Sequence, residues 1–309
     1  MSILVVGSVA LDTVETPFAR ADRVLGGSAV FFGAAAALFS PVRVVGVVGD
    51  DYPMEDLSFL KEKGVDFEGL EQATGESFFW SGRYAFDFSS RETLETKLGV
   101  FASFDPQVPE AYRDSDLVFL GNIDPTLQLN VLKQVRKPKL VAADTMNFWI
   151  EGTREPLVEL LGHLDVLFLN DEEARQLAGV ANLSKAAAWI QERGPDVVVI
   201  KKGEHGAVLF TREWAFFIPG FPLEEVCDPT GAGDAFAGGF MGYLDFVGSR
   251  SPEDLRRAMV YGSAMGSYAV EAFSVERFRT IQADEVADRV RIFREMTAFE
   301  LELPVSGHE

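Results

Sequence analysis

The chain has 309 residues, 47% of them hydrophobic, which is enough to bury a large core in one α/β domain or two smaller ones. Its 48 acidic and 28 basic residues give a formal net charge of −20, which would repel a nucleic-acid backbone and an anionic membrane surface. Neither nucleic acid nor a membrane is therefore expected as a partner.

The N-terminal segment and the cysteine content favour a cytoplasmic location. The residues before Asp12 lack the basic region of a signal peptide, and no apolar run reaches the roughly 18 residues of a membrane span. Cys227 is the one cysteine and cannot form an internal disulfide, which suits a reducing compartment. We therefore expect a cytoplasmic protein.

Short apolar segments alternate with helix-like segments along the chain. The apolar segments are rich in Val and Ile and are bounded by Gly, Asp or Pro, which is typical of strands buried on both faces of a parallel sheet. The predicted strands are residues 3–6, 42–48, 117–120, 140–143, 166–169 and 197–200. The predicted helices include residues 33–39, 157–161 and 184–193, the last with Ser184 as its N-terminal cap. The alternation, without a linker or repeat, predicts one domain with a layered α/β fold.

Residues 78–88 break this alternation. Their even positions are mostly aromatic and several odd positions are polar, which is the period of two of a β-strand. The aromatic residues are Phe78, Trp80, Tyr84, Phe86 and Phe88. A second extended segment, 93–101, follows the turn-like residues 89–91, so the two segments predict a hairpin with one aromatic face. We interpret it as a lid built mainly from about residues 75–103, with an antiparallel edge of the main sheet as the alternative.

Residues 227–236, Cys-Asp-Pro-Thr-Gly-Ala-Gly-Asp-Ala-Phe, are the most informative segment for chemistry. Gly231 and Gly233 allow a tight turn with outward N–H groups, and the small apolar residues after Asp234 predict a buried helix. Backbone amides and the helix dipole could together bind a phosphoryl group, and Asp234 could accept the proton of an attacking hydroxyl. An isolated Gly-x-Gly-Asp would more often be a glycine-capped helix with an N-terminal carboxylate.

The whole of segment 227–236 resembles the C-terminal signature of the ribokinase/PfkB carbohydrate-kinase family. Residues 7–12 resemble the family's first strand with its substrate-binding Asp, and Gly26-Gly27 resembles the glycine pair that lies against the sugar. Residues 170–173, Asn-Asp-Glu-Glu, resemble the Asn-x-x-Glu motif that holds the water shell of magnesium. Residues 198–207 resemble the strand and loop of the adenine site. These matches follow one another in the family's order over most of the chain.

The resemblance implies a fold, a reaction and a partner. The fold is a ribokinase-like three-layer α/β/α arrangement with a mostly parallel central sheet and a small β lid, and residues 1–309 form a single kinase domain. The implied reaction is ATP-dependent phosphorylation of the hydroxymethyl group of a small sugar, with Mg²⁺ as cofactor. The lid has two candidate roles, to cover the acceptor or to form a homodimer, and the sequence leaves both open.

The resemblance also implies the roles of individual residues. Catalysis is assigned to Asp234 as general base and to the backbone of Gly231, Ala232 and Gly233 as anion hole. Acceptor binding is assigned to Asp12, Gly26 and Gly27 and to the position of Phe31. ATP binding is assigned to Lys201, Gly203, Gly206 and Thr230. Asn170 and Glu173 are assigned to Mg²⁺ through water, and Asp228 is a candidate ligand of K⁺, as in relatives activated by monovalent cations.

The assigned residues also have physical interpretations of their own. Asp12 comes just after the first strand, where open α/β sheets bind ligands, and a carboxylate can accept two hydroxyl hydrogen bonds. Asn170 and Glu173 follow the strand 166–169, and their hard oxygen atoms suit Mg²⁺. Without the family resemblance, a helix cap, a tight turn or a solvated strand end would explain each of these features equally well.

The acceptor side departs from the family pattern. Many relatives carry an Asn four residues after the second glycine of the pair, whereas this chain has Phe31, and Ser8 stands where several relatives carry Asn. Phe31 removes a hydrogen-bonding group and adds an apolar ring, so recognition of ribose as in ribokinase itself is not expected. A nucleobase could stack on the aromatic face of the lid. We keep a sugar as the preferred acceptor and a nucleoside as the alternative.

Other classes of function fit less well. A catalytically silent sugar- or nucleotide-binding protein on the same fold is a second alternative, but the intact Asp234 argues against it. The chain has no G-x-x-x-x-G-K-S/T loop, so it is not a P-loop kinase. The string that begins at Gly231 has Phe236 in the last place of G-x-G-x-x-G, which disfavours a Rossmann dehydrogenase.

Overall fold

A nine-stranded sheet forms the centre of the computed structural model, which describes residues 2–88 and 90–299. The strand order is β13-β12-β11-β10-β9-β8-β1-β4-β5. Neighbours from β11 to β5 pair in parallel, whereas β12 and β13 extend the sheet antiparallel. The strands are β1 (Ile3–Val6), β4 (Val42–Val48), β5 (Val65–Gln72), β8 (Leu117–Leu120), β9 (Leu140–Asp144), β10 (Val166–Asn170), β11 (Val197–Lys201), β12 (Ala207–Phe210) and β13 (Ala215–Ile218). The predicted strands are all present in this sheet.

Helices cover both faces of the sheet, which gives three layers. Alternate residues of β1 point into different cores: Ile3 and Val5 into one, Leu4 and Val6 into the other. The first core is covered by α1 (Ser28–Ala36), α2 (Ser58–Glu62), α8 (Ala232–Val247), α9 (Pro252–Ala269), α10 (Glu276–Thr280) and α11 (Ala283–Thr297). The second is covered by α3 (Pro125–Leu132), α4 (Asn147–Gly152), α5 (Arg154–Leu161), α6 (Asp171–Ala178) and α7 (Leu183–Gln191). The predicted three-layer α/β/α class is confirmed.

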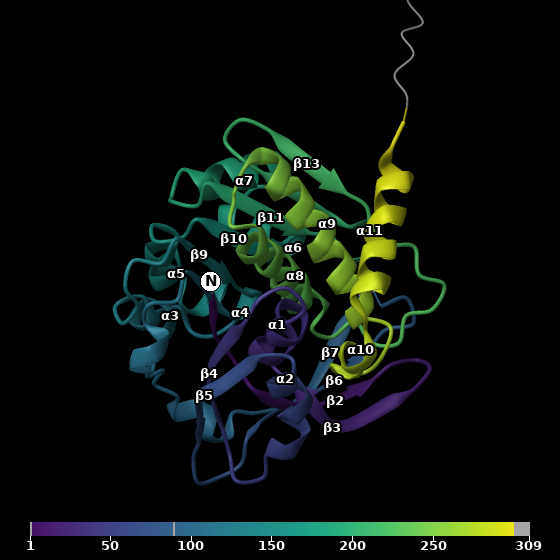
Figure 1. Ribbon diagram of the computed structural model, residues 1–309. Coiled ribbons are helices and arrows are strands. Elements are labelled where there is room, and N and C mark those ends of the chain that lie inside the picture. The colour runs from purple at the N-terminus through teal and green to yellow at the C-terminus, as the bar shows by residue number, and fades with distance from the viewer. Residues whose placement is uncertain (1, 89, 300–309) are drawn as a thin grey trace, which may run out of the picture.

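The lid is a separate four-stranded sheet with the order β3-β2-β6-β7. Its strands are β2 (Ala10–Glu15), β3 (Arg20–Gly26), β6 (Phe78–Tyr84) and β7 (Arg91–Lys97). In Figure 1 they lie together at the lower right, whereas β9, β10 and β11 lie toward the top. The hairpin of β6 and β7 therefore does not form an edge of the main sheet. Half of the lid comes from residues 10–26, outside the predicted range of about 75–103.

The predicted alternation of β6 is present in the structure. This strand pairs with β2 in an unbroken parallel register, and the irregularity beside Ser81 and Gly82 falls on β7. Phe79 packs on the main core, whereas Trp80 lies opposite Asp12 in the register and points to the same side of the lid. Tyr84 is buried on that side, but Phe86 lies beyond the strand and is 79% exposed. Ser89 of the predicted turn lies outside the described residues.

Three predicted helix starts were wrong, and the first of these is helix α5, which begins at Arg154 and not at residue 157. Helix α1 begins at Ser28 and not at residue 33, because Gly27 caps it with φ 94° and every residue from Ser28 to Ala36 is buried. A helix that is apolar all round has no polar face to mark its limits. Helix α7 begins at Leu183, capped by Asn182, whose side chain accepts a hydrogen bond from the Lys185 N–H.

Among the described residues, no helix combines the length and the apolar character that crossing a membrane requires. Within residues 2–88 and 90–299 there are also four short 3₁₀ helices: η1 (Met54–Leu57), η2 (Gly99–Ser103), η3 (Glu110–Tyr112) and η4 (Gly203–His205).

Candidate active site

The carboxyl ends of the central strands and the N-terminus of α8 meet on one side of the sheet. Strands β9, β10 and β11 end at Asp144, Asn170 and Lys201, and α8 begins at Ala232. The lid closes over the same place from β2 and β6, since the Tyr84 hydroxyl lies 3.0 Å from Thr230 Oγ1. This geometry brings most of the predicted site residues together.

Gly231 caps α8 in the left-handed conformation, with φ 76°. A Cβ added there would lie 2.2 Å from the ring of Phe31, whose side chain is buried beneath the loop. Glycine is therefore required at 231 both by the backbone conformation and by the packing. Phe31 was predicted at the acceptor; in the structure its ring packs against Gly231, which caps α8.

Asp234 lies in the first turn of α8 and keeps partial access to solvent. Desolvation by the surrounding protein, followed by the charge of Asp144, raises the pKa of Asp234 to about 7, while Lys201 and Arg91 oppose the rise. A carboxylate with a pKa near neutrality is suited to taking a proton from a hydroxyl, because it is available as a base and binds the proton well.

Lys201 reaches from the end of β11 to Asp144 at the end of β9. The distance from its Nζ to Asp144 Oδ2 is 2.8 Å, and the two side chains are 17% and 8% exposed. Burial lowers the pKa of Lys201, but the carboxylates of Asp144 and Glu173 more than compensate, so the pKa is raised. The ammonium stays charged. It points toward α8, because a Cβ on Gly233 would lie 2.8 Å from Nζ.

Asn170 and Glu173 form a capping box at the start of α6. The Asn170 side chain accepts a hydrogen bond from the Glu173 N–H at 2.8 Å, and Glu173 Oε2 accepts one from the Asn170 N–H at 2.7 Å. Burial, with a contribution from Asp144, raises the pKa of Glu173 to about 7. The motif thus has a local structural role and also holds a buried carboxylate at the strand end. That carboxylate would be favoured in its charged form by a cation.

The sequence predicted that Asp12 directly follows a strand of the main sheet. In the structure Asp12 lies inside β2, a strand of the lid. A Cβ on Gly26 would lie 2.1 Å from Asp12 Oδ2, so the glycine makes room for this carboxylate. Burial, followed by the charges of Asp228 and Asp234, raises the pKa of Asp12 to about 7, while Arg91 and the Gly27 N–H oppose the rise. Asp12 and Asp234 therefore belong to one site.

Asp228 is almost fully buried and only partly hydrogen-bonded. Its Oδ1 accepts a hydrogen bond from the Thr230 N–H at 2.8 Å, whereas Oδ2 has no hydrogen-bond partner within the described part of the chain. Burial raises the pKa of Asp228, and the Thr230 hydrogen bonds partly offset this. An orphaned buried carboxylate oxygen fits a bound cation. Residues 2–88 and 90–299 hold no group of three His, Cys, Asp or Glu side chains that could bind a metal ion by themselves.

Gly203 and Gly206 border the turn between β11 and β12, with φ 55° and 87°. A Cβ on Gly206 would lie 2.0 Å from the carbonyl oxygen of Ile218, so close packing against the end of β13 explains this glycine. A Cβ on Gly203 would meet nothing within 4 Å. These residues lie on the far side of Lys201 from the centre of the sheet.

Sequence reasoning missed two charged residues of this site. Asp144 directly follows the predicted strand 140–143, and an acidic residue at a buried strand end was the available signal. Arg91 was assigned only to a turn, but its charge acts on Asp12, Glu173 and Asp234 from the start of β7. No sequence signal links Arg91 to residues so far away in the chain.

Comparison with known proteins gives a consistent result. Residues 3–278 match the model of the pfkB family of carbohydrate kinases. The chain is 32% identical over 248 residues to a cytidine kinase of Thermococcus kodakarensis, which covers 78% of this chain and 87% of that protein. It is 27% identical over 290 residues to a nucleoside kinase of Methanothermobacter thermautotrophicus, and the match covers 87% of this chain and 89% of that protein. Among solved structures, a candidate ribokinase II from E. coli in complex with ATP and Mg²⁺ superimposes with a TM-score of 0.77 at 18% identity, covering 94% of this chain and 99% of that one.

Proposed function

Because the chain belongs to the PfkB family of carbohydrate kinases and is thus an ATP-dependent phosphotransferase, we propose that it phosphorylates the hydroxymethyl group of a nucleoside. The observation that carries the proposed chemistry is the position of Asp234. Its carboxylate lies beside the glycine-capped N-terminus of α8 and within electrostatic range of Asp12 on the lid. In this proposal Asp234 is the proton acceptor, the start of α8 is the anion site and Asp12 is the carboxylate that binds hydroxyls.

In this proposal Asp234 takes the proton of the acceptor hydroxyl as its oxygen attacks the γ-phosphorus of ATP. The bond from the γ-phosphorus to the bridging oxygen of ADP breaks as the new bond forms. The backbone of Gly231, Ala232 and Gly233 and the dipole of α8 stabilise the negative charge that shifts onto the transferred group. Thr230 holds this loop to the lid through its contact with Tyr84.

We assign the remaining ATP and cation contacts as follows. Gly203 and Gly206 line the adenine side. Asn170 and Glu173 hold the water shell of Mg²⁺, which neutralises phosphate charge when bound, and the raised pKa of the buried Glu173 carboxyl fits a nearby cation. Asp228 offers its orphaned Oδ2 to K⁺.

Acceptor binding is proposed for the face of the lid that carries Asp12. This carboxylate binds vicinal hydroxyls of the ribose, and Gly26 and Gly27 let the ring approach the backbone. Trp80, opposite Asp12 in the strand register, is positioned to stack on a base. The relatives named for cytidine and nucleosides support this acceptor over the free sugar that the sequence alone favoured.

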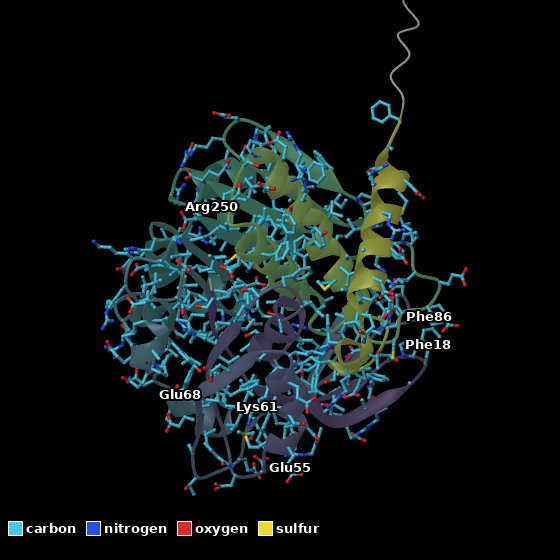
Figure 2. All side chains as sticks on the ribbon, in the orientation of Figure 1. Phe18, Glu55, Lys61, Glu68, Phe86 and Arg250 are labelled. Atoms are coloured by element: carbon cyan, nitrogen blue, oxygen red, sulfur yellow. The ribbon has the colours of Figure 1, made fainter. Side chains whose placement is uncertain are left out.

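The lid is also our candidate for a homodimer contact. At its tips Phe18 is 67% exposed and Phe86 79% exposed, and their ring centroids are 6.0 Å apart. Figure 2 shows the two side chains next to each other at the edge of the molecule. A second copy of the chain could bury this aromatic surface.

The decisive experiment replaces Asp234 by Asn and measures ATP consumption with cytidine, other nucleosides, ribose and other sugars. Loss of a general base lowers turnover by about 10²–10⁴-fold, and nucleotide binding should survive. Asp284→Asn is the matched control, because Asp284 occupies the first turn of α11 and is exposed. Wild-type turnover in Asp234→Asn would refute the assignment of the base. Turnover with free sugars and none with nucleosides would refute the assignment of the acceptor.

A further inference from the structure

A buried lysine lies at the phosphate end of the site. Lys201 ends β11, and its side chain extends to the start of α8. A Cβ on Gly233 would lie 2.8 Å from Lys201 Nζ and 3.5 Å from Cε. The missing side chain of Gly233 therefore leaves the space in which the ammonium approaches the helix N-terminus.

The position of the ammonium is fixed by Asp144. The 2.8 Å contact to Asp144 Oδ2 uses one of its three N–H donors, and Asp144 Oδ1 accepts a hydrogen bond from the Thr145 N–H at 2.8 Å. Asp144 is the one acceptor bonded to this ammonium within the described residues. Two N–H donors are therefore available to a ligand. A lysine that served only to neutralise Asp144 would not need to extend to Gly233.

The carboxylates around Lys201 explain why a cation is needed at the start of α8. Asp144, Glu173 and Asp234 all act electrostatically on Lys201, and the Arg91 guanidinium acts on Glu173 and Asp234 from β7, so carboxylates outnumber cations at this place. The chain as a whole carries a formal charge of −20. These carboxylates would repel a triphosphate bound beside them unless a fixed positive charge faced its terminal phosphate.

We propose that Lys201 binds the γ-phosphoryl group of ATP and stabilises it during transfer, with Asp144 as its positioning residue. This inference rests on the proposed kinase function and replaces the adenine-side role that the sequence suggested for Lys201. Lys201 keeps its proton throughout. The bond from the γ-phosphorus to the ADP oxygen breaks as the bond to the acceptor oxygen forms, and the hydroxyl proton goes to Asp234. The Lys201 ammonium stabilises the negative charge on the phosphoryl oxygens throughout this step.

The test compares Lys201→Met with the double variant Lys201→Met/Asp144→Asn. The single change leaves the Asp144 carboxylate buried without its partner, whereas the double change removes the ion pair as a unit. Lys185→Met is the matched control, since Lys185 is an exposed lysine of α7 with no proposed role in the site. We expect turnover to fall about 10²–10³-fold in both Lys201 variants, as when a donor to a developing oxyanion is removed, and to stay near wild type in Lys185→Met.

The second measurement separates a phosphate contact from a structural role. Binding of a non-transferable imido analogue of ATP should weaken at least roughly tenfold in the double variant, as expected for a lost charge-assisted hydrogen bond, while ADP binding stays within about threefold. Equal weakening of ADP and of the ATP analogue would overturn the inference, as would wild-type turnover. If both Lys201 variants fail to fold, Gly233→Ala displaces the same ammonium from a folded chain and must show the same selective loss.

This outcome can be told apart from failure of the proposed function. If Asp234→Asn is inactive while the Lys201 variants keep full turnover, only the role of Lys201 is wrong. If Asp234→Asn itself keeps wild-type turnover, the catalytic assignment fails first.

Discussion

Gly231 and Gly233, at the start of α8, are required for different reasons. Gly231 has φ 76° and its α-carbon faces the Phe31 ring, so a side chain there is strained and collides with a buried aromatic. Gly233 lies inside α8, and its α-carbon faces only the flexible end of Lys201. The same substitution at the two positions should therefore damage different properties.

We predict that Gly231→Ala lowers both stability and turnover, whereas Gly233→Ala lowers turnover alone. A left-handed backbone costs a non-glycine residue about 1–2 kcal/mol before the collision with Phe31 is counted. Replacing a helical glycine by alanine stabilises by up to about 1 kcal/mol. Thermal unfolding and turnover of the two purified variants provide the check. Equal stability losses would show that the contact with Phe31 does not determine the requirement at 231.

At the scale of elements, the lid combines the face that carries Asp12, our proposed acceptor face, with an exposed aromatic tip. Trp80 shares a face with Asp12; its indole N–H donates to Thr93 Oγ1 at 3.3 Å, and the Arg91 guanidinium lies 5.3 Å from its ring centroid. Phe18 and Phe86 lie at the turns that follow β2 and β6. The two proposed roles of the lid thus use different residues and can be separated by mutation.

We predict that Trp80→Ala weakens nucleoside binding by about 1–3 kcal/mol, the magnitude of one base stacked on an aromatic ring, and leaves the subunit mass in solution unchanged. Phe86→Ala serves as the matched change, because it removes a ring from the tip and leaves the face with Asp12 intact. It should reduce any dimer and leave nucleoside affinity unaltered. Calorimetric titration and light scattering measure the two effects. A Trp80→Ala variant that dissociates a dimer and binds nucleoside normally would reverse the assignment.

At the scale of the whole molecule, the site buries carboxyl groups whose ionisation is unfavourable. Burial holds the pKa of Asp12 and of Asp234 at about 7, above the ordinary value of 3.8. Between those values the folded chain binds more protons than the unfolded chain. The contribution of these carboxyl groups to the free energy of unfolding is therefore fully present below about pH 4 and is lost as pH rises to about 7. Self-repulsion of a chain with a net charge of −20 acts in the same direction.

We therefore predict that the unfolding temperature of the ligand-free protein falls between pH 5 and pH 7.5. Asp12→Asn removes one of the three carboxyl groups whose pKa is raised to about 7, the others being Glu173 and Asp234, and should reduce the fall. Differential scanning calorimetry across this range measures both, with Asp284→Asn as the control for a surface carboxylate. A constant or rising unfolding temperature would mean that these carboxyls are not desolvated in the folded chain.

Much of the architecture followed from local sequence. Continuous runs of Val and Ile such as residues 42–48 predict strands buried on both faces, because only a sheet covered by two layers accepts them. The segment 227–236 predicts a glycine-capped helix, because few other conformations accommodate Gly-Ala-Gly before a run of small residues. The alternation in residues 78–88 predicts the aromatic face of β6. These signals depend on near neighbours in the chain.

What only the tertiary structure decided depends on residues far apart in the chain. Residues 10–26 join the lid because β2 pairs with β6, and no local pattern specifies a parallel partner more than 60 positions away. Phe31 is buried because Gly231 packs on its ring. Lys201 faces α8 because the ion pair with Asp144 holds its ammonium there. The sequence by itself determined which segments are strands, helices and glycine-rich turns, since these follow from backbone conformation and side-chain period. The direction in which each charged side chain points was decided by packing and by the free energy of burying a charge, which depend on the assembled fold.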